Sequence, residues 1–410
     1  MKELSCRLCR ETLTTTFVDL GMSPLSNAYV AAERADEPET TYPLHAYVCD
    51  RCLLVQVGEF ASREQIFADS DYLYFSSYSE AWLAHARAYA EMAVRRFGLG
   101  PKSLVMEVAS NDGYLLQYFV ERGIPALGIE PAANVAAAAR RKGVDTRAEF
   151  FGEALARRLA AEGFAADLIA ANNVLAHVPD LHDFVGGFRH VLKPRGVLTI
   201  EFPWLKNLVE LVQFDTIYHE HFSYLSLATA RRALAAHGLA VFDVEALSTH
   251  GGSLRVYAGH ADAHAETPAV ARFLSAEAAA GLGRLATYRA FAPKVVDVKC
   301  GVLEFLLQAR RDGKRVAGYG AAAKGNILLN YCGIGPELLP FTVDRNPHKQ
   351  GRLLPGSRIP ICDPSAIREA RPDYVLILPW NLRDEIAGQM AWIRDWGGRF
   401  ATPVPRVEVF

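Results

Sequence analysis

The chain of 410 residues lacks three features that would assign it to large classes of protein. It has no excess of one charge, because 44 basic residues oppose 46 acidic residues and leave a net charge of −2. It contains no apolar run near the roughly 20 residues that a membrane span needs. Its first residues, MKELSCRLCR, have no apolar core like that of a signal peptide. The sequence therefore predicts a cytoplasmic protein with neither nucleic acid nor a membrane as its partner.

A glycine-rich fingerprint is also missing from the middle of the chain, where strand and helix patterns alternate. The segments SLVMEVAS, IPALGIEP, ADLIAANN and GVLTIEFP are predicted strands, and one long helix is predicted from about Tyr78 to Gly98. Such βαβ alternation predicts a parallel, doubly wound sheet. The loop after the first strand, EVASNDGYL, has a single glycine, whereas the dinucleotide fingerprint G-x-G-x-x-G has three. This difference argues against NAD binding at this sheet.

Cysteine is scarce, but four of the seven cysteines form two C-x-x-C pairs, CRLC and CDRC. The four thiolates of Cys6, Cys9, Cys49 and Cys52 are the ligand set of a tetrahedral structural zinc site. Disulfides are disfavoured in a reducing cytosol, and a redox motif is disfavoured because no βαβ pattern surrounds the pairs. The intervening residues 10–48 are rich in Pro, Thr and Glu, so we expect an irregular segment that the metal organises.

One short stretch, IYHEHFSYLS, concentrates the acid–base groups of Tyr218, His219, Glu220, His221 and Tyr224. An H-x-H pair is a familiar metal-ligand spacing, but no third or fourth ligand is evident nearby. A structural histidine cluster is a second interpretation. Catalysis is the third and preferred one, because an imidazole with a pKa of about 6.5 can remove a proton near neutral pH. An extended or turn conformation would place His219 and His221 on one side and Glu220 on the other.

An ordered set of motifs in the middle of the chain resembles the class I methyltransferases that use S-adenosylmethionine. The set comprises EVASNDGYL, the acid Glu130, AEFF and ANNVLAHV. Glu130 lies about 20 residues after the loop, where an acid can bind both ribose hydroxyls, and the resemblance implies that role. The resemblance also implies that the loop around the amino-acid end of the cofactor is formed by Ser110, Asn111, Asp112 and Gly113. It implies that the adenine lies near Glu149, Phe150 and Phe151, and that the methionine portion lies near Asn172 and Asn173. The loop departs from the usual first motif, which has more glycines.

Carbon methylation explains best why a dense acid–base cluster would accompany a methyl-donor site. Methyl transfer to oxygen or nitrogen often needs little beyond positioning. Transfer to carbon needs an enolate, a general base that forms it, and polar groups that hold the enolate oxygen.

The whole chain resembles the bacterial C-methyltransferases of unusual deoxysugars, which act on nucleotide-linked 4-keto sugars. The resemblance rests on CRLC…CDRC, YLYFSSYSE, EVASNDGYL, ANNVLAHV, YHEHFSYLS, HGGSLRVY and GYGAAAKGN…FTVDRNPHKQG, in that order. It implies that His221 is the general base, that Tyr218 and Glu220 are its neighbours, and that Tyr72 and His177 surround the sugar. The implied reaction methylates the ring carbon next to the ketone, C3 in the first instance, of a sugar carried by thymidine diphosphate (dTDP). The implied setting is deoxysugar and antibiotic biosynthesis.

The last third of the chain contains a second unit of nucleotide-binding type. KRVAGYGAAAKGNILLNYCG predicts a strand, a glycine turn and a helix, and the strands of LPFTVDRNPHKQG and PDYVLILPW follow. GYGAAAKG is not a P-loop, because its lysine precedes the last glycine. One interpretation of this unit is a pure scaffold. The resemblance implies instead that it helps to hold the nucleotide sugar, with Lys324 at a helix N-terminus as the candidate for the diphosphate and Asn326 as a weaker one.

The expected fold class is α/β, with a zinc-binding domain at 1–70, a class I methyltransferase domain at 71–262 and a Rossmann-like domain at 263–410. Two other functions stay open at this point. An epimerase or an NAD(P)-dependent oxidoreductase would use the same base cluster together with the C-terminal glycine turn. A non-enzymatic scaffold would use only the zinc domain. The oligomeric state also stays open, with a monomer as one option.

Overall fold

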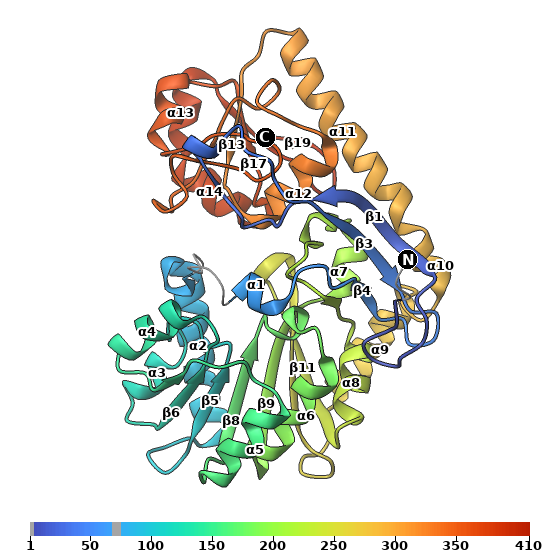
Figure 1. Cartoon of the computed structure of the whole chain (residues 1–410), viewed down its shortest axis with the longest axis vertical. Coiled ribbons are helices and arrows are strands. Elements are labelled where there is room, and N and C mark those ends of the chain that lie inside the picture. Colours follow the sequence, from blue (N-terminus) through green and yellow to red (C-terminus); the bar gives the residue numbers. More distant parts are fainter. Residues whose placement is uncertain (1–3, 68–74) are drawn as a thin grey trace.

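A seven-stranded sheet forms the core of the lower lobe of the molecule (Figure 1). The computed structural model describes residues 4–67 and 75–410 of the chain. The strand order is β7–β6–β5–β8–β9–β12–β11, parallel from β7 to β9 and closed by β12, which is antiparallel to both of its neighbours. The strands are β5 (Val105–Val108), β6 (Ala126–Ile129), β7 (Thr146–Arg147), β8 (Ala166–Asn172), β9 (Leu192–Pro203), β11 (Leu239–Leu247) and β12 (Ser253–His260). The predicted doubly wound sheet is confirmed, and an antiparallel hairpin completes it.

Helices cover both faces of this sheet because its strands are apolar on both faces. The helices are α2 (Glu80–Phe97), α3 (Gln117–Val120), α4 (Ala133–Arg141), α5 (Glu153–Ala161), α6 (Leu181–Val191), α7 (Leu205–Glu210) and α8 (Leu227–Ala235). In β5, Met106 packs into the core that contains α5, α6 and α8, whereas Val105 packs into the core that contains α2 and α3. The predicted long helix is confirmed as α2, and Gly98 ends it with φ of 63°, the left-handed conformation that ends many helices.

The N-terminal part forms a four-stranded sheet in the order β1–β3–β4–β10. Its strands are β1 (Thr15–Ser23), β3 (Tyr42–Val48), β4 (Val55–Val57) and β10 (Ser223–Tyr224). The expectation of an irregular segment between the cysteine pairs is therefore wrong, because β1 and β3 lie in that segment and pair antiparallel. Phe17 and Leu44 on these strands are fully buried, so apolar packing organises the segment in addition to the metal. The short elements β2 (Val30–Ala31) and α1 (Arg63–Phe67) complete this part.

The upper lobe contains a six-stranded sheet in the order β16–β14–β13–β17–β18–β19 (Figure 1). Its strands are β13 (Val316–Tyr319), β14 (Thr342–Val343), β16 (Ile361–Cys362), β17 (Tyr374–Ile377), β18 (Arg399–Thr402) and β19 (Glu408–Val409), all parallel except β19. The helices of the last third of the chain are α9 (Pro268–Ala279), α10 (Leu285–Arg289), α11 (Phe291–Arg311), α12 (Ala323–Cys332), α13 (Ser365–Ala370) and α14 (Arg383–Gln389). Of these, α9 packs against β11 and α8 of the lower lobe, and α10 packs against β1. The three-part α/β fold class is thus confirmed, while the boundaries after residues 70 and 262 stay predictions.

Two short strand pairings join the N-terminal part to both lobes. The strand β4 pairs with β10, which directly follows the histidine-rich stretch of the middle part. The strand β2 pairs with β15 (Arg352–Leu353) of the C-terminal part. The blue strands β1 and β3 run alongside the long helix α11 on one side of the molecule (Figure 1). Across the described ranges, no helix combines the length and the apolarity needed to cross a membrane.

Candidate active site

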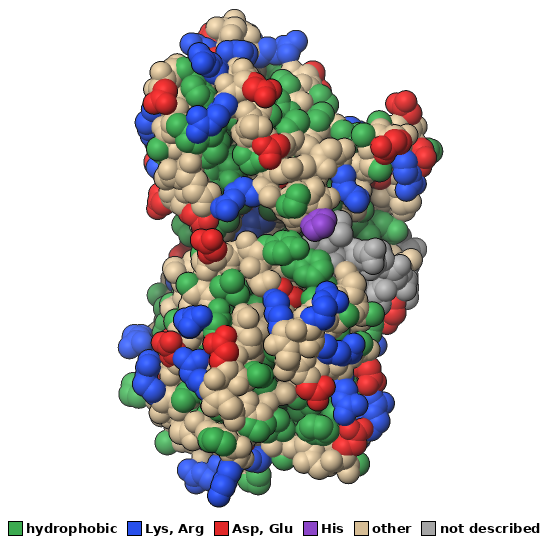
Figure 2. Space-filling model, turned by 90° about the vertical axis from the view of Figure 1, so that its left-hand side faces the viewer, with side chains coloured by type: hydrophobic (Ala, Val, Ile, Leu, Met, Phe, Trp, Pro, Cys, Tyr) green, Lys and Arg blue, Asp and Glu red, His purple; other side chains and the backbone are tan. Residues whose placement is uncertain are grey.

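A large cavity of about 740 Å³ lies where the parts of the chain meet. The space-filling view shows the surface hollowed between the two lobes (Figure 2). The wall includes most of the residues that the sequence singled out: Asn111, Glu130, Glu149, Phe150, Phe151, Asn172, Asn173, His177, Tyr218, Glu220, His221 and Lys324. The cavity therefore lies at the carboxyl ends of β5, β6 and β8, where open α/β sheets bind their ligands.

One half of the cavity is built around the carboxylate of Glu130, at the end of β6. Its Oε2 accepts a hydrogen bond from the backbone N–H of Asn111 at 3.0 Å, and its Oε1 accepts one from Ala132 at 2.9 Å. Burial raises the pKa of Glu130 to about 7. The carboxylate is thus held in one orientation at the cavity wall, as binding of two adjacent hydroxyls requires.

Three predicted residues of the cofactor loop support the loop rather than the cavity wall. Ser110 is fully buried beside Gly128, and the buried side chain of Asp112 pairs with Lys142 at 2.9 Å. Gly113 adopts φ of 77°, which turns the chain towards α3. Asn111 also has a positive φ of 47°, and its side chain accepts a hydrogen bond from the backbone of Ser76 at 2.8 Å. The loop therefore reaches its shape with one glycine because Asn111 and Ala109, with φ of 59°, take two further left-handed positions.

The chemistry of the wall at the end of β8 fits the methionine portion of S-adenosylmethionine. The amide oxygens of Asn172 and Asn173 are buried, and no described residue donates a hydrogen bond to them. Both residues line the cavity, so these acceptors face a ligand that carries donors, such as an ammonium group. Arg63 of α1 lies 4.5 Å over the ring of Phe150, a residue predicted to lie near the adenine, and both residues line the cavity.

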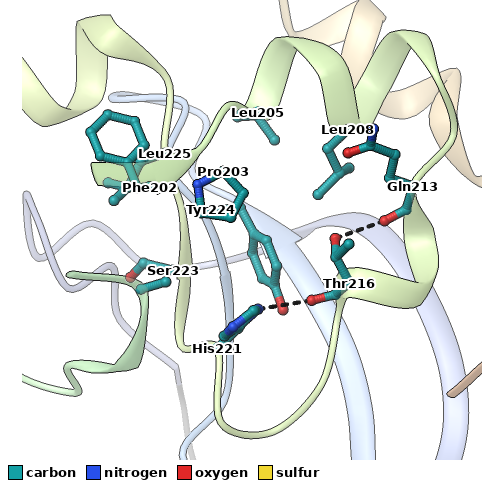
Figure 3. A pocket seen from close by; sticks show the side chains of 11 residues that line it. Phe202, Pro203, Leu205, Leu208, Gln213, Thr216, His221, Ser223, Tyr224 and Leu225 are labelled. Carbon is teal, nitrogen blue, oxygen red and sulfur yellow. Dashed lines mark hydrogen bonds between the residues drawn. The ribbon is translucent and has the colours of Figure 1, made fainter. Parts of the chain in front are cut away.

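The other half of the cavity is built around His221, whose Nδ1 donates to the backbone carbonyl of Thr216 at 2.9 Å (Figure 3). A carbonyl can only accept, so Nδ1 carries the proton and Nε2 keeps a lone pair. The ring of His177 lies 4.6 Å from that of His221, and the ring of Tyr218 lies 4.0 Å from it, between centroids. Burial, together with the neighbouring His177, holds the pKa of His221 well below its usual range. His221 is therefore a neutral imidazole with one basic nitrogen at neutral pH.

The turn that contains His221 separates the two histidines of the YHEH stretch. The backbone N–H of His221 donates to the carbonyl of Tyr218 at 2.9 Å, which reverses the chain. The expectation that His219 and His221 share one side is therefore wrong: His221 and Glu220 both line the cavity. The Nε2 of His219 instead donates to the carbonyl of Pro43 at 3.2 Å, outside the cavity wall.

Glu220 connects the histidine-rich turn to the N-terminal part of the chain. Its Oε1 accepts a hydrogen bond from the side chain of Asn27 at 2.6 Å. Burial raises the pKa of Glu220 to about 7, while Asn27 and the nearby Lys349 act in the opposite direction. This carboxyl group can therefore change its protonation state near neutral pH.

The C-terminal part contributes two lysines to the cavity wall, Lys324 and Lys349. Lys324 lies in the first turn of α12, its Nζ donates to Asn381 at 3.2 Å, and it lies 4.9 Å over the ring of Trp380. Burial lowers the pKa of Lys324, and the carboxylate of Asp215 opposes that shift. The predicted Asn326 is buried in α12 and does not line the cavity. The predicted Tyr72 lies outside the described residues.

Sequence reasoning missed several residues of the cavity wall, among them Asn27, Arg63, Trp82, His85, His250 and Lys349. His250 had a signal, since it belongs to the motif HGGSLRVY that was quoted without a role. It adopts φ of 55°, and burial lowers its pKa to about 4. Lys349 had the same kind of signal, since it belongs to the quoted motif FTVDRNPHKQG. Trp82 and His85 lie on the predicted long helix, whereas Asn27 and Arg63 carry no local pattern.

The four predicted zinc ligands come together in one cluster. Their sulfur atoms all lie within 4.8 Å of one another, with Cys6 and Cys52 at 3.5 Å and Cys9 and Cys49 at 3.4 Å. Tetrahedral zinc with Zn–S bonds of about 2.3 Å places its sulfurs about 3.8 Å apart. Each short contact joins one cysteine of each pair, which is the arrangement of a shared ion rather than of two separate motifs. The cluster therefore fits a closed structural zinc site.

The sheet order, the cavity at its carboxyl ends and the four-cysteine cluster define a class I, S-adenosylmethionine-dependent methyltransferase with a zinc-binding domain. Residues 6–67 match the family model "Putative zinc binding domain", residues 82–244 match "Methyltransferase domain", and residues 248–405 match "C-methyltransferase C-terminal domain". The C-methyltransferase NovU of Streptomyces niveus is 37% identical over 405 residues, which cover 98% of this chain and 96% of that protein. The chain belongs to the family of S-adenosylmethionine-dependent C-methyltransferases.

Solved structures are also similar to part of the chain. Magnesium protoporphyrin IX methyltransferase from Synechocystis PCC 6803, with bound SAH, is 16% identical, with a TM-score of 0.35. The similarity covers 44% of this chain and 83% of that one.

Proposed function

We propose that this C-methyltransferase methylates the ring carbon next to the ketone of a dTDP-linked 4-keto deoxysugar, at C3, within deoxysugar and antibiotic biosynthesis. The observation that carries the proposal is the state of His221. Its Nδ1–H is fixed by the carbonyl of Thr216, so its Nε2 keeps a lone pair, and it lines the same cavity as Glu130. A neutral imidazole beside a methyl-donor site is the group that proton removal from carbon requires.

The reaction begins when the Nε2 of His221 takes the proton from the carbon next to the ketone. The electron pair of that C–H bond becomes the enolate, whose negative charge lies mainly on the former ketone oxygen. Tyr218, against the ring of His221, supplies a hydroxyl that can donate to that oxygen, and His177 closes the pocket. Bound S-adenosylmethionine would supply an electrophilic methyl group. Glu130, Asn172 and Asn173 would hold this cofactor. The imidazolium of His221 then returns its proton to solvent.

The lysines of the C-terminal part support a nucleotide-linked sugar as the substrate. Lys324 and Lys349 both line the cavity, and Lys324 lies at the N-terminus of α12, where backbone N–H groups favour anions. The two cations match the two phosphates of a nucleoside diphosphate. The order of sequence motifs that resembles the deoxysugar C-methyltransferases supports the same substrate class. These features concern the substrate, whereas membership of the C-methyltransferase family favours methyl transfer over the epimerase and oxidoreductase alternatives.

The base assignment is tested by replacing the two histidines of the YHEH stretch one at a time. His221 lines the cavity, and His219 does not. His221→Asn should keep both ligands bound and lower turnover by roughly a hundred- to ten-thousandfold, because general-base catalysis contributes that much. The matched control His219→Asn should retain turnover near that of the wild type. Tyr218→Phe should show an intermediate loss. Equal losses in the His219 and His221 variants would contradict the assignment.

A second experiment separates proton removal from methyl transfer. The enzyme is incubated in deuterated water with S-adenosylhomocysteine and a 4-keto nucleotide sugar, so that no methyl can move. The wild type should incorporate deuterium at the carbon next to the ketone, and His221→Asn should not. A panel of nucleotide-linked 4-keto sugars with labelled methyl donor then identifies the substrate and the methylated carbon. Binding of NAD(H) or NADP(H) in place of the methyl donor would favour the alternative functions.

A further inference from the structure

Arg7, between the two cysteines of the first pair, reaches from the zinc cluster to the backbone that follows His177 and His221. Its Nε donates to the carbonyl of Pro179 at 3.1 Å. Its Nη1 donates to the carbonyl of Phe222 at 3.1 Å and to that of Val57 at 2.7 Å. The guanidinium also lies 5.3 Å over the ring of Phe222. One side chain of the zinc-binding part thus holds three separate backbone segments.

Two of these segments carry the histidines of the proposed base site. Phe222 directly follows His221, and Pro179 lies two residues after His177. The same segments are joined to each other by the hydrogen bond from the backbone of Phe222 to the carbonyl of Ala176, at 2.7 Å. The separation of 4.6 Å between the two histidine rings therefore depends on a few backbone hydrogen bonds, and the side chain of Arg7 binds both of the segments involved.

The position of Arg7 is itself fixed by the cysteine cluster. Its backbone N–H donates to the side chain of Gln56 at 2.9 Å, and Gln56 donates in turn to the sulfur of Cys6 at 3.3 Å. Gln56 is fully buried, so this connection is rigid. Among residues 4–67 and 75–410, no carboxylate lies within ion-pair distance of Arg7. Its hydrogen-bonding capacity is spent on backbone carbonyls, in a planar geometry that a lysine or a glutamine cannot reproduce.

We propose that Arg7 is a positioning residue for catalysis, which couples the zinc cluster to the relative placement of His177 and His221. The proposal rests on the proposed role of His221 and extends it, because it gives the zinc-binding part a function in the reaction geometry. Loss of the three hydrogen bonds removes the side-chain link between the cysteine cluster and both histidine-bearing segments. The pairing of β4 with β10 and the hydrogen bond from His182 to the carbonyl of Leu8 remain. A displacement of about 1 Å at a reacting group can lower the rate by about a hundredfold, so turnover should be sensitive to this contact.

The test compares Arg7→Gln with two control variants in the full-length zinc-loaded protein. Arg51→Gln removes the corresponding arginine of the second cysteine pair, which is exposed and contacts neither histidine-bearing segment. Leu44→Ala removes a fully buried side chain of the same sheet and gives a destabilised protein for comparison. Arg7→Gln should lower kcat about ten- to a hundredfold with the KM of both substrates changed less than about threefold. Both controls should keep kcat near the wild-type value, and all variants should keep one zinc per chain.

A measurement without substrates separates this proposal from the base assignment. Nitrogen resonances of histidine, recorded on the labelled protein, report the environment of His177 and His221 directly. Arg7→Gln should shift both sets of resonances, whereas Arg51→Gln and Leu44→Ala should not. Unchanged resonances, a kcat equal to that of the wild type, or an equal loss in Leu44→Ala would overturn the positioning role. If Arg7→Gln shifts the resonances while His221→Asn keeps full activity, only the assignment of His221 as the base is contradicted.

Discussion

At the scale of single residues, the cofactor half of the site depends most on Glu130. Glu130→Ala should weaken the binding of S-adenosylmethionine about ten- to a hundredfold, because two ribose hydroxyls lose a charged acceptor. Isothermal titration calorimetry measures this change. The exposed Glu162 on the same domain provides the control, since Glu162→Ala should bind the cofactor as the wild type does. Unchanged affinity in Glu130→Ala would place the ribose elsewhere.

The buried state of Glu130 also predicts a pH dependence of that affinity. Burial raises the pKa of Glu130 to about 7, so a large fraction is protonated in the free enzyme at pH 6. Hydrogen bonds from ribose hydroxyls favour the ionised form, so the pKa falls on binding and a proton is released. The affinity should therefore rise as the pH increases from about 5 to 7 and level off above 7. Glu130→Ala should lack this component when the two titrations are subtracted, and identical pH profiles would contradict the assignment.

The place of a site residue was predictable from the sequence where its motif also determines which way its side chain points. The four cysteines follow from their spacing, and Glu130 follows from its place after the loop together with the resemblance to class I methyltransferases; they lie at the cluster and at the cavity wall. The choice between His219 and His221 does not follow from alternation, because a turn at Tyr218 overrides it. Asp112 shares a loop with Asn111, but its pairing with Lys142 turns its side chain away from the cavity. Such choices depend on partners that are distant in the sequence.

At the scale of secondary-structure elements, the two cysteine pairs connect directly to the strands of the N-terminal sheet. The second pair ends at Cys52, and β4 begins at Val55. We predict one zinc per chain, bound by four thiolates with no open coordination position. Metal analysis of protein purified without chelator measures the stoichiometry, and a value near zero would exclude the site.

Replacement of one zinc ligand should separate turnover from the binding of S-adenosylmethionine. Cys49→Ser should unfold the N-terminal part, because structural zinc sites supply folding free energy directly. Turnover should fall with it, since β4 pairs with β10 next to His221. Binding of S-adenosylmethionine should persist, because the seven-stranded sheet contains no strand of that part. Cys300→Ser provides the matched control on an exposed free thiol and should change neither property.

Elements with a strong local pattern were predictable, and elements that depend on distant partners were not. The helix α2 and the strands β5, β6, β8 and β9 follow from periodicity and turn residues, and all are present. The strands β1 and β3 were missed because the many Pro, Thr and Glu residues between the cysteine pairs obscure the apolar residues of the two strands. The pairing of β4 with β10 joins residues far apart in the sequence, so no local pattern reports it.

At the scale of the whole molecule, a continuous apolar core joins all three parts of the chain. It contains Phe17 of the N-terminal part, Phe214 of the middle part and Leu328 of the C-terminal part. The ring of Phe214 is fully buried and lies 5.4 Å from that of Tyr331 on α12. The lobes should therefore unfold together rather than one after the other.

Phe214→Ala tests this coupling between the lobes. It should lower the free energy of unfolding by about 3–5 kcal/mol, which is the usual cost of truncating a buried phenylalanine. Differential scanning calorimetry should show a single transition that shifts as a whole. Leu307→Ala, on the exposed face of α11, is the control and should shift the transition little. Two transitions, of which only one moves, would show that the lobes are independent.

The pairing of β4 with β10 sets an order of events for the nascent chain on the ribosome. Residues 55–57 emerge long before residues 223–224 exist, and at 5–20 residues per second the interval is roughly 10–30 s. The hydrogen bond of Tyr29 to the carbonyl of Ala321 can form only later still, after residue 321 has been synthesised. The cysteine cluster needs only residues 6–52, so it can bind zinc early and hold the N-terminal segment during this wait. Zinc supply during translation should therefore govern how much of this enzyme reaches its native state.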